Sequence, residues 1–384
     1  MKIALVRARY SPFGGAERFA ARALAALAAD ADGVDVAVLA RRWADVEAAG
    51  ALPTGVRLVR CDPFYVGSVW RDASFAKAVH RRLAVERFDL VQSHERIVGL
   101  PIYRAGDGVH AAWLERRARA APFATRLGIA LNPHHRYLLA TERAMFAHPA
   151  LRTVICNSEM VRAEIAGRFA IDPAKLVLIR NGVDLVRFDP SVAARDDGAT
   201  RRRLALADDA TVFVMVGSGF ERKGVAAALT ALAACADAAL IVVGGDRHRD
   251  RFEALATQLG VAARVRFVGP VDDPLPYYAA ADAMLAPALY DPFPNAALEA
   301  LACGLPVVAS DACGVAELLD GGDAGWVVPT GDVDALVDAM REAIACGAER
   351  RGTMRRAARA AAEPHSLVAL SAALMALYRT LLGR

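Results

Sequence analysis

The sequence predicts two α/β domains in tandem, each built on a parallel β-sheet. Three observations predict this: the chain has 384 residues, 55% of them are hydrophobic, and one pattern begins twice. Residues 2–6 (KIALV) form a short apolar run that precedes a glycine-containing loop and an alanine-rich helix over residues 16–29. Residues 211–220 (TVFVMVGSGF) open a second unit of the same kind. A chain of this length is too long for a domain with one ordinary hydrophobic core. A strand, a glycine loop and a helix in that order typically open a doubly wound α/β domain.

Further short apolar runs, bounded by turn residues, predict the remaining strands. In the first half these runs lie at residues 34–40, 56–60, 90–93 and 153–157. In the second half they lie at residues 239–243, 265–268, 283–286, 306–309 and 325–328. We predict a first domain over residues 1–190 and a second over residues 191–384, with the polar stretch 191–203 as linker. The last helix, residues 367–382, is predicted to pack back towards the first domain. A ligand-binding cleft is expected between the carboxyl edges of the two sheets.

The charge is unevenly distributed along the chain. Residues 1–190 hold 28 Lys and Arg against 19 Asp and Glu. A basic first half favours an anionic membrane surface or a phosphorylated acceptor, whereas no interleaved aromatic and basic stretch indicates nucleic acid. The six cysteines are scattered, which favours reduced thiols and no metal. With no signal peptide or membrane span predicted, we expect a cytoplasmic protein that is at most peripheral to the membrane. A basic cluster, for which a solvated face is favoured, is formed by Arg116, Arg117 and Arg119.

The segment MLAPALYDPFPNAALEALACGLPVVAS, residues 284–310, carries the strongest site signal. A strand is predicted to end at Pro287, and a helix to begin near Asn295, which could cap it. The free N–H groups and positive end of such a helix suit a diphosphate. Asp291 and Glu299 flank this helix start. Two carboxylates beside phosphate-binding amides suit a nucleotide sugar, because carboxylates accept hydrogen bonds from sugar and ribose hydroxyls.

Several motifs resemble the retaining GT-B glycosyltransferases of the family 4 type (glycosyl transferases group 1), over nearly the whole chain. Asp291-x7-Glu299 is similar to the Glu-x7-Glu signature of that family, and FERKGV, with Arg222 and Lys223, to its diphosphate-binding element. YSPFGGAERF is similar to its glycine loop. Within the family, SPFGGAERF and GSGFERKGV look most like the lipopolysaccharide core glucosyltransferases. The resemblance implies two Rossmann-like domains in the GT-B arrangement.

The resemblance also implies which residues form the donor site. The implied donor-binding residues are Gly14, Gly15, Arg222, Lys223, Val268, Phe293, Pro294, Asn295, Ala296 and Glu299. Among these, Arg222, Lys223 and Glu299 are also assigned to catalysis, together with Asp291 and with His94, which is placed there by its position at the end of a predicted strand. Arg222 and Lys223 would stabilise the departing diphosphate, so neither metal nor cofactor is expected. The first acid is Asp291 instead of Glu, and the loop after it reads Pro-Phe-Pro-Asn, so contacts to the donor sugar are expected to differ from the family pattern.

The acceptor side is predicted in the first half of the chain. His94 and Glu95 follow a predicted strand in VQSHER, and Asp107 lies in the glycine-flanked loop of RAGDGVH. Resemblance to the lipopolysaccharide branch implies that Asp107 faces the acceptor, and Glu95 and Arg18 are assigned to the same site. His94 or Asp107 is a candidate general base.

These observations predict a retaining glycosyltransferase that transfers a hexose from a nucleotide sugar, with a UDP-sugar such as UDP-glucose favoured. The predicted acceptor is a glycan or lipid-linked glycan of the lipopolysaccharide core or another bacterial surface polysaccharide. The acceptor hydroxyl is expected to attack from the front face with help from the leaving phosphate. Two alternatives stay open: a GT-B nucleotide-sugar epimerase, which needs no separate acceptor, and a non-catalytic subunit that binds a sugar nucleotide.

Overall fold

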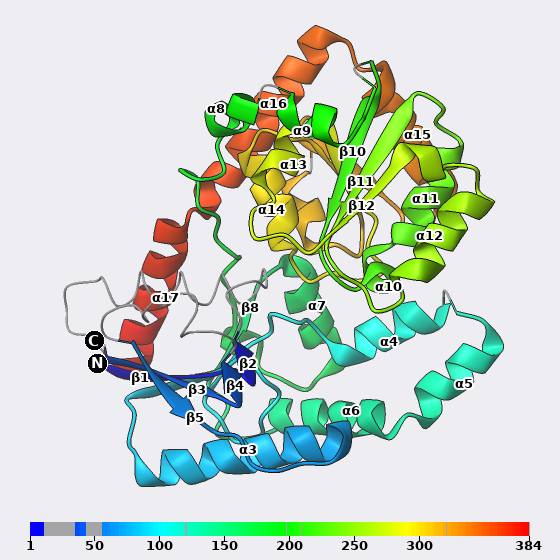
Figure 1. Cartoon of the computed structure of the whole chain (residues 1–384). Coiled ribbons are helices and arrows are strands. Elements are labelled where there is room, and N and C mark those ends of the chain that lie inside the picture. The colour runs from blue at the N-terminus through cyan, green and yellow to red at the C-terminus, as the bar shows by residue number, and fades with distance from the viewer. Residues whose placement is uncertain are drawn as a thin grey trace. The chain divides into compact units, whose positions relative to one another are not determined.

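The computed structural model describes residues 1–10, 35–43, 56–119, 121–196, 198–207, 209–319 and 321–383. The chain divides into two compact units (Figure 1). Unit 1 comprises Met1–Asn181 together with Leu367–Arg384, and unit 2 comprises Gly182–Ser366. Each unit has one main β-sheet with a buried apolar cluster on either face. The predicted α/β class, with two parallel sheets, is confirmed.

Unit 1 is built on a seven-stranded sheet in the order β5-β3-β1-β6-β7-β8-β9. Every strand pair described in it is parallel. The strands are β1 (Lys2–Val6), β3 (Asp35–Ala40), β5 (Val56–Arg60), β6 (Leu90–Ser93), β7 (Ile102–Arg104), β8 (Thr153–Cys156) and β9 (Leu176–Leu178). A separate short pair joins β2 (Arg9–Tyr10) and β4 (Arg42–Trp43). The chain runs from β1 outwards to β5 and then returns to β6, so the strand order reverses between β1 and β6.

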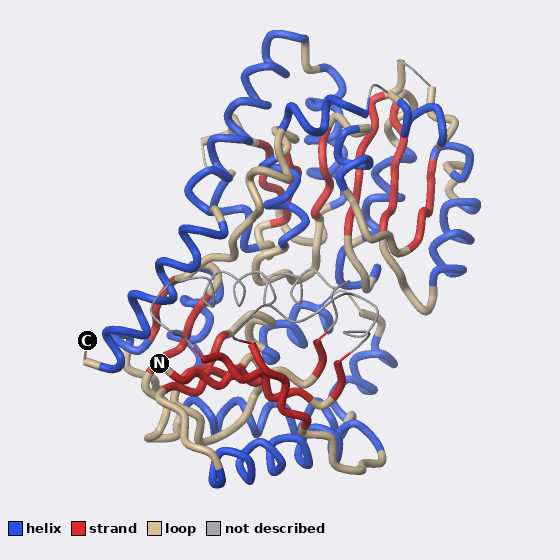
Figure 2. The backbone as a smooth tube through the Cα atoms, turned by 60° about the vertical axis from the view of Figure 1, so that its left-hand side comes forward, coloured by secondary structure: helices blue, strands red, loops and turns tan. Residues whose placement is uncertain are grey.

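Helices cover both faces of this sheet (Figure 2). The helices of unit 1 are α3 (Gly67–Val85), α4 (His110–Arg119), α5 (Phe123–Leu131), α6 (Pro133–Phe146), α7 (Glu159–Arg168) and α17 (Leu367–Leu382). Phe75 of α3 packs on one face of the sheet, whereas Leu374 and Tyr378 of α17 pack on the other. The Tyr378 hydroxyl donates to Gln92 Oε1 at 2.8 Å, which satisfies two buried polar groups in that core. The helix predicted over residues 16–29 lies outside the described residues.

Unit 2 is built on a six-stranded parallel sheet in the order β12-β11-β10-β13-β14-β15. The strands are β10 (Thr211–Val216), β11 (Ala238–Val243), β12 (Val265–Gly269), β13 (Ala283–Ala286), β14 (Val307–Ser310) and β15 (Gly325–Val328). The helices are α8 (Pro190–Ala193), α9 (Ala199–Arg203), α10 (Phe220–Lys223), α11 (Val225–Ala233), α12 (Arg249–Gln258), α13 (Leu275–Ala279), α14 (Asn295–Ala302), α15 (Val333–Ala345) and α16 (Ala348–Ala362). Here the strand order reverses between β10 and β13.

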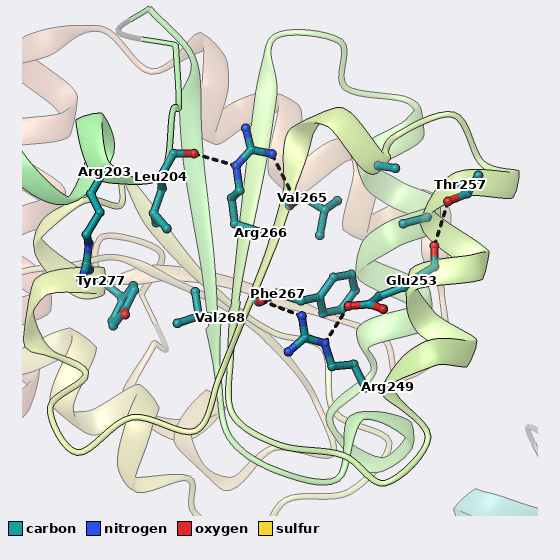
Figure 3. Close-up of a pocket in the computed structure, with 12 residues that line it drawn as sticks. Arg203, Leu204, Arg249, Glu253, Thr257, Val265, Arg266, Phe267, Val268 and Tyr277 are labelled. Carbon is teal, nitrogen blue, oxygen red and sulfur yellow. Dashed lines mark hydrogen bonds and ion pairs between the residues drawn. The ribbon is translucent and has the colours of Figure 1, made fainter.

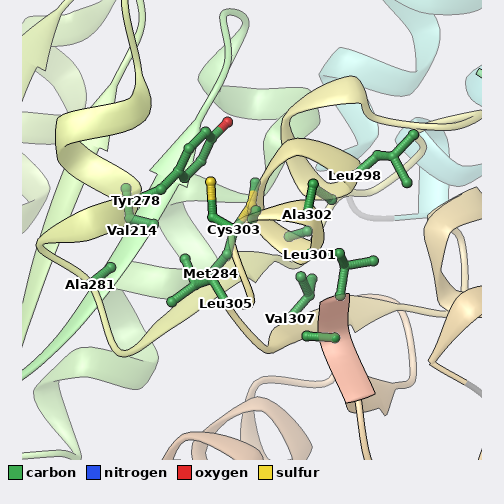
Figure 4. Close-up of a cluster of buried hydrophobic side chains, with 14 of the residues drawn as sticks. Val214, Tyr278, Ala281, Met284, Leu298, Leu301, Ala302, Cys303, Leu305 and Val307 are labelled. Carbon is green, nitrogen blue, oxygen red and sulfur yellow. The ribbon is translucent and has the colours of Figure 1, made fainter. Parts of the chain in front are cut away.

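Helix α14 is fixed by the apolar cluster behind it (Figure 4). Its Leu298 and Leu301 are fully buried and belong to one cluster with Tyr278 of α13 and Val307 of β14. A fully buried leucine contributes about 1.5–3 kcal/mol relative to an exposed one. This packing therefore holds the helix start, and the loop that precedes it, in a fixed position at the carboxyl ends of β13 and β14.

The division between the units falls after Asn181, earlier than the boundary expected after residue 190. Val183 and Phe188 are buried in the core of unit 2, and the Arg359 guanidinium donates to Phe188 O at 2.9 Å. The stretch 191–203, expected to be a linker, instead carries α9 within unit 2. Its polar residues have partners there, since Arg201 pairs with Asp282 at 2.8 Å. None of the described helices has the length and apolar character needed to cross a membrane.

Candidate functional site

A buried ion pair lies at the reversal point of the sheet in unit 2. Lys223, at the end of α10, donates from Nζ to Asp291 Oδ2 at 2.7 Å. Arg222 is more exposed, with its NH1 at 3.9 Å from the same carboxylate oxygen. Lys223 follows β10 in the chain and Asp291 follows β13, and these strands are neighbours. The fold thus joins two predicted residues that are 68 positions apart in the sequence, at the position where parallel α/β sheets bind ligands.

Two glycines allow Lys223 to reach this position. Gly224 has φ +77°, and a Cβ there would lie 2.0 Å from the carbonyl oxygen of Pro287. This close approach lets Leu289 N donate to Arg222 O at 2.9 Å, which ties the helix to the loop after β13. Gly217 has φ +144°, and a Cβ there would lie 2.7 Å from Lys223 Cε. Any larger residue at either position would therefore displace the lysine or the loop.

Asp291 is held ionised by its neighbours. Burial alone would raise the pKa of its carboxyl, but the charges of Lys223 and Arg222 and the bonds from Lys223 and Phe293 N outweigh it, so the pKa lies below its ordinary value. The backbone of Asp291 is fixed as well, because its N–H donates to Ala312 O at 3.0 Å and its carbonyl accepts from Gly314 N at 2.8 Å. Asp291, which is one methylene shorter than the Glu of the family pattern, therefore lies in a rigid loop and forms an ion pair with Lys223.

The other predicted donor residues lie close along the chain but play different local roles. Glu299 is on α14, where its Oε2 accepts a hydrogen bond from the Tyr278 hydroxyl at 3.0 Å. Asn295 is the first residue of α14 and not its cap; the cap is Pro294, which makes no side-chain capping bond. The Phe293 side chain is buried in the core, and Ala296 packs against the same cluster. Lys223, Asp291 and Pro294 line one small pocket.

Val268 lies elsewhere in unit 2, in a hollow of about 530 Å³ along the edge strand β12 (Figure 3). Among the described residues that line this hollow, it alone belongs to the predicted donor set. Arg249 donates to Phe267 O at 2.9 Å, Arg266 donates to Val265 O at 3.1 Å, and the Arg203 guanidinium lies over the Tyr277 ring. Arg249 and Arg266 thus occupy carbonyl groups of the edge strand β12, which blocks pairing with another strand.

Two of the residues predicted in the first half of the chain, His94 and Glu95, lie directly beyond the end of β6 in unit 1. The Nε2 atom of His94 is 3.1 Å from Gln92 Nε2. Burial, with Arg7 and Arg104 nearby, holds the pKa of His94 well below its ordinary value, so the imidazole is neutral at pH 7. Glu95 accepts a bond from Ala8 N at 2.9 Å, and burial raises the pKa of its carboxyl. A neutral imidazole is the form that can act as a general base.

Asp107 is exposed on a loop whose neighbouring residues are each held by a side chain. Asn157 Nδ2 donates to Gly106 O at 3.3 Å, and Arg96 donates to Gly108 O at 2.9 Å. Glu142 Oε1 accepts from His110 N at 2.7 Å and from Arg96 Nε at 2.8 Å. The loop therefore presents the Asp107 carboxylate in a defined place. Sequence reasoning missed Glu142, because an acid in the middle of a helix is usually solvated.

Three predicted site residues, Gly14, Gly15 and Arg18, lie outside the described residues. Within the described ranges, no group of three or more His, Cys, Asp or Glu side chains is placed to hold a metal ion. In unit 2 the described cluster consists of the Lys223–Asp291 pair with Arg222. In unit 1 the polar residues around His94 and Asp107 form another cluster within that unit.

Two family models match the chain: Glycosyltransferase Family 4 over residues 13–187 and Glycosyl transferases group 1 over residues 196–361. Lipopolysaccharide glucosyltransferase WaaG of Escherichia coli (strain K12) is 28% identical over 333 residues, which cover 85% of this chain and 85% of that protein. A D-inositol 3-phosphate glycosyltransferase of Kribbella flavida is 30% identical over 330 residues, which cover 80% of this chain and 75% of that protein.

Solved structures show the same fold. A crystal structure of WaaG, a glycosyltransferase involved in lipopolysaccharide biosynthesis, matches with a TM-score of 0.83 at 26% identity, covering 98% of this chain and 99% of that chain. Anabaena HepE in complex with UDP-glucose matches with a TM-score of 0.74 at 21% identity, covering 99% and 100%. The chain therefore belongs to the group 1 (family 4) glycosyltransferases, as a GT-B-fold enzyme that transfers a sugar from a nucleotide sugar.

Proposed function

We propose that the chain transfers a hexose from a UDP-sugar, with retention of configuration, to a glycan of the lipopolysaccharide core or another bacterial surface polysaccharide. The observation that carries the donor side is the Lys223–Asp291 pair with Arg222 at the reversal point of the sheet in unit 2. Similarity to WaaG, named a lipopolysaccharide glucosyltransferase, and to HepE, solved with UDP-glucose, supports this choice of donor and acceptor.

In this proposal Lys223 and Arg222 bind the diphosphate. As the bond to the sugar breaks, negative charge grows on the leaving phosphate, and fixed cations that already point at it stabilise that charge without reorganising. Asp291 positions Lys223 and accepts a hydroxyl hydrogen bond from the donor sugar, and Glu299 binds the donor from α14. Arg222 contributes a planar fork that matches two phosphate oxygens.

In unit 1 the proposed acceptor residues are Asp107, Glu95 and Arg18, with His94 as the residue next to the reacting hydroxyl. Of the residues among these that the structure describes, Asp107 is the best placed to bind an acceptor. Its side chain is exposed, while the backbone on both sides of it is held by hydrogen bonds. Neutral His94 can accept a proton from the acceptor hydroxyl, or the leaving phosphate can accept it in front-face attack. The second route is the one we propose, since it explains retention without a nucleophile on the protein.

Retention is tested by the anomeric configuration of the product. Wild-type enzyme is incubated with UDP-α-glucose and a truncated lipopolysaccharide core, and the new linkage is read from its anomeric proton coupling. We expect an α-linked product and release of UDP that depends on the added acceptor. A β-linked product would rule out front-face transfer, and conversion of the donor sugar without an acceptor would favour an epimerase.

We further propose that unit 1 contacts an anionic membrane through α5. Phe123, Leu127 and Leu131 are 80%, 51% and 65% exposed and recur every four residues, so they lie on one face of the helix. The preceding helix α4 ends in three arginines, although Arg116 is paired with Glu164 at 2.5 Å. An apolar face beside basic residues suits the interface of a bilayer that contains anionic lipids.

Changing Phe123, Leu127 and Leu131 together to serine is expected to weaken binding to vesicles by about tenfold or more, because three apolar side chains no longer enter the interface. Sedimentation with vesicles of phosphatidylcholine and phosphatidylglycerol measures it. A matched control changes three exposed apolar residues outside α5 to serine: Val85, Val186 and Val368. Equal loss in the control, or equal binding to vesicles without phosphatidylglycerol, would contradict the proposal.

A further inference from the structure

Three neighbouring strands of unit 1 place two arginines and a histidine in one row. In the sheet register, Val6 of β1 pairs with Ser93 of β6, and Ser93 pairs with Tyr103 of β7. The next residues are Arg7, directly beyond the end of β1, His94, directly beyond the end of β6, and Arg104, the last residue of β7. The backbone hydrogen bonds continue there, since Arg7 N donates to Leu39 O at 3.0 Å and His94 N to Val6 O at 2.9 Å. Neighbouring strands lie about 4.8 Å apart, so the backbones of the two arginines are separated only by that of the histidine.

The three side chains of this row point to the same face of the sheet. Residues two positions apart on a strand share a face, and the row of Leu5, Gln92 and Ile102 lies two positions earlier. Leu5 and Ile102 are in the core beneath α17, and Gln92 is bonded to Tyr378 of that helix and lies beside His94. Arg7, His94 and Arg104 therefore form a polar row where this core ends, at the carboxyl edge of the sheet.

The row carries positive charge in a partly buried place. Arg104 is 2% exposed and donates to Asn181 Oδ1 at 2.9 Å. Burial, together with the charge of Arg7, lowers the pKa of Arg104 to about 10, so Arg104 remains charged at pH 7 and the two guanidinium groups repel one another. Within the described ranges, Arg7 Nε is buried and has no hydrogen-bond partner. Holding two like charges together in this way costs free energy.

The carboxylate of Glu95 lies near Arg7 but is already bonded elsewhere. Glu95 interacts electrostatically with Arg7, but its Oε1 is committed to Ala8 N at 2.9 Å, and burial raises the pKa of its carboxyl. His94 adds no charge, but its neutral ring can donate or accept one hydrogen bond. Among the described residues, Arg7 has no ion-pair partner, and an anion with several acceptor oxygens would supply one.

We propose that Arg7, His94 and Arg104 form a binding site for a phosphoryl group in unit 1. The planar guanidinium of Arg7, whose Nε has no hydrogen-bond partner, supplies donors that match phosphate oxygens, and Arg104 adds positive charge beside it. The site lies at the reversal between β1 and β6, which is the place in unit 1 that corresponds to the Lys223–Asp291 site between β10 and β13 in unit 2. The phosphoryl group comes from a phosphorylated acceptor or from the donor diphosphate. Only this choice of source rests on the proposed function.

Phosphate binding is measured in a background without the unit 2 site, the Lys223→Met/Asp291→Asn variant. The melting temperature is followed with inorganic phosphate against chloride at equal ionic strength. We expect phosphate to stabilise this background, and Arg7→Gln to raise the apparent Kd for phosphate by about tenfold or more. Without phosphate, Arg7→Gln should melt at the same temperature or higher, because a like-charge repulsion is removed. Arg60→Gln, which removes an arginine whose side chain is 78% exposed, should change neither result.

The outcomes separate the site from its source and from the wider function. If Arg7→Gln lowers the melting temperature and leaves the phosphate effect intact, Arg7 is structural and the proposal fails. Arg7→Lys, which keeps the charge and loses the fork, should show weaker phosphate binding at unchanged stability; full retention would also overturn it. The source of the phosphoryl group is identified by measuring UDP binding to a chain with an intact unit 2 site. If Arg7→Gln weakens UDP binding, the phosphoryl group belongs to the donor diphosphate; if UDP binding is unchanged, it belongs to the acceptor. If no sugar nucleotide binds to the wild-type chain, the proposed donor is wrong, but the proposed phosphate site in unit 1 is not contradicted.

Discussion

Replacing Lys223 by methionine is expected to lower the rate of sugar transfer by about 10²–10³-fold, the usual effect of removing one group that stabilises a departing anion. The same change should lower stability, because it leaves the carboxylate of Asp291 buried without its partner. Steady-state release of UDP, measured beside the melting temperature, gives both effects.

The double variant Lys223→Met/Asp291→Asn separates these two roles. With both charges removed, the desolvation cost disappears, so stability should return close to that of the wild type. Activity should not return, since the cation at the diphosphate is still missing. Recovery of activity in the double variant would mean that Lys223 serves only to balance Asp291.

Replacing Glu142 by alanine is expected to destabilise unit 1 by about 3–5 kcal/mol. The carboxylate is fully buried and pairs with part-buried Arg96, so its loss leaves a guanidinium without its counter-charge. The bond from His110 N is lost at the same time, which releases the loop that presents Asp107. Denaturant unfolding measures the first effect, and a raised KM for the acceptor measures the second.

An exposed ion pair on the same unit supplies the control. Glu115 pairs with Arg168 at 2.6 Å on the surface, and Glu115→Ala is expected to cost at most about 1 kcal/mol because water screens such pairs. Glu142→Gln, which keeps an acceptor oxygen for His110 N, should fall between the two in stability. Equal losses for Glu142→Ala and Glu115→Ala would show that the buried pair does not hold this loop.

The sequence predicted the local elements well because each depends on neighbouring residues. The run TVFVMV is a buried strand in any parallel sheet, and the predicted α/β class follows from the repetition of such runs. The linker prediction was wrong for a reason that lies outside the segment. Its polar residues are partnered by distant groups, as Arg201 is by Asp282, and no local pattern reveals such a partner.

Site residues could be predicted from the sequence only where a local motif contains them. The interval between Asp291 and Glu299 is visible in the sequence, but the bonds of these residues are not. Glu299 is bonded to Tyr278, whereas Asp291 is bonded to Lys223. The row of Arg7, His94 and Arg104 could not be predicted from the sequence at all, because it is formed only by the register of three strands that are far apart in the chain.

Titration of UDP-glucose into the wild-type chain and into Lys223→Met/Asp291→Asn tests most directly whether unit 2 binds the donor through this pair. We expect saturable binding by the wild type and a Kd raised by at least about tenfold in the double variant. We also expect one sugar nucleotide to stabilise the wild type more than the others in a panel that adds UDP-galactose, UDP-N-acetylglucosamine, GDP-mannose and ADP-heptose. Equal affinity in both proteins, or no binding of any of these donors to the wild type, would contradict it.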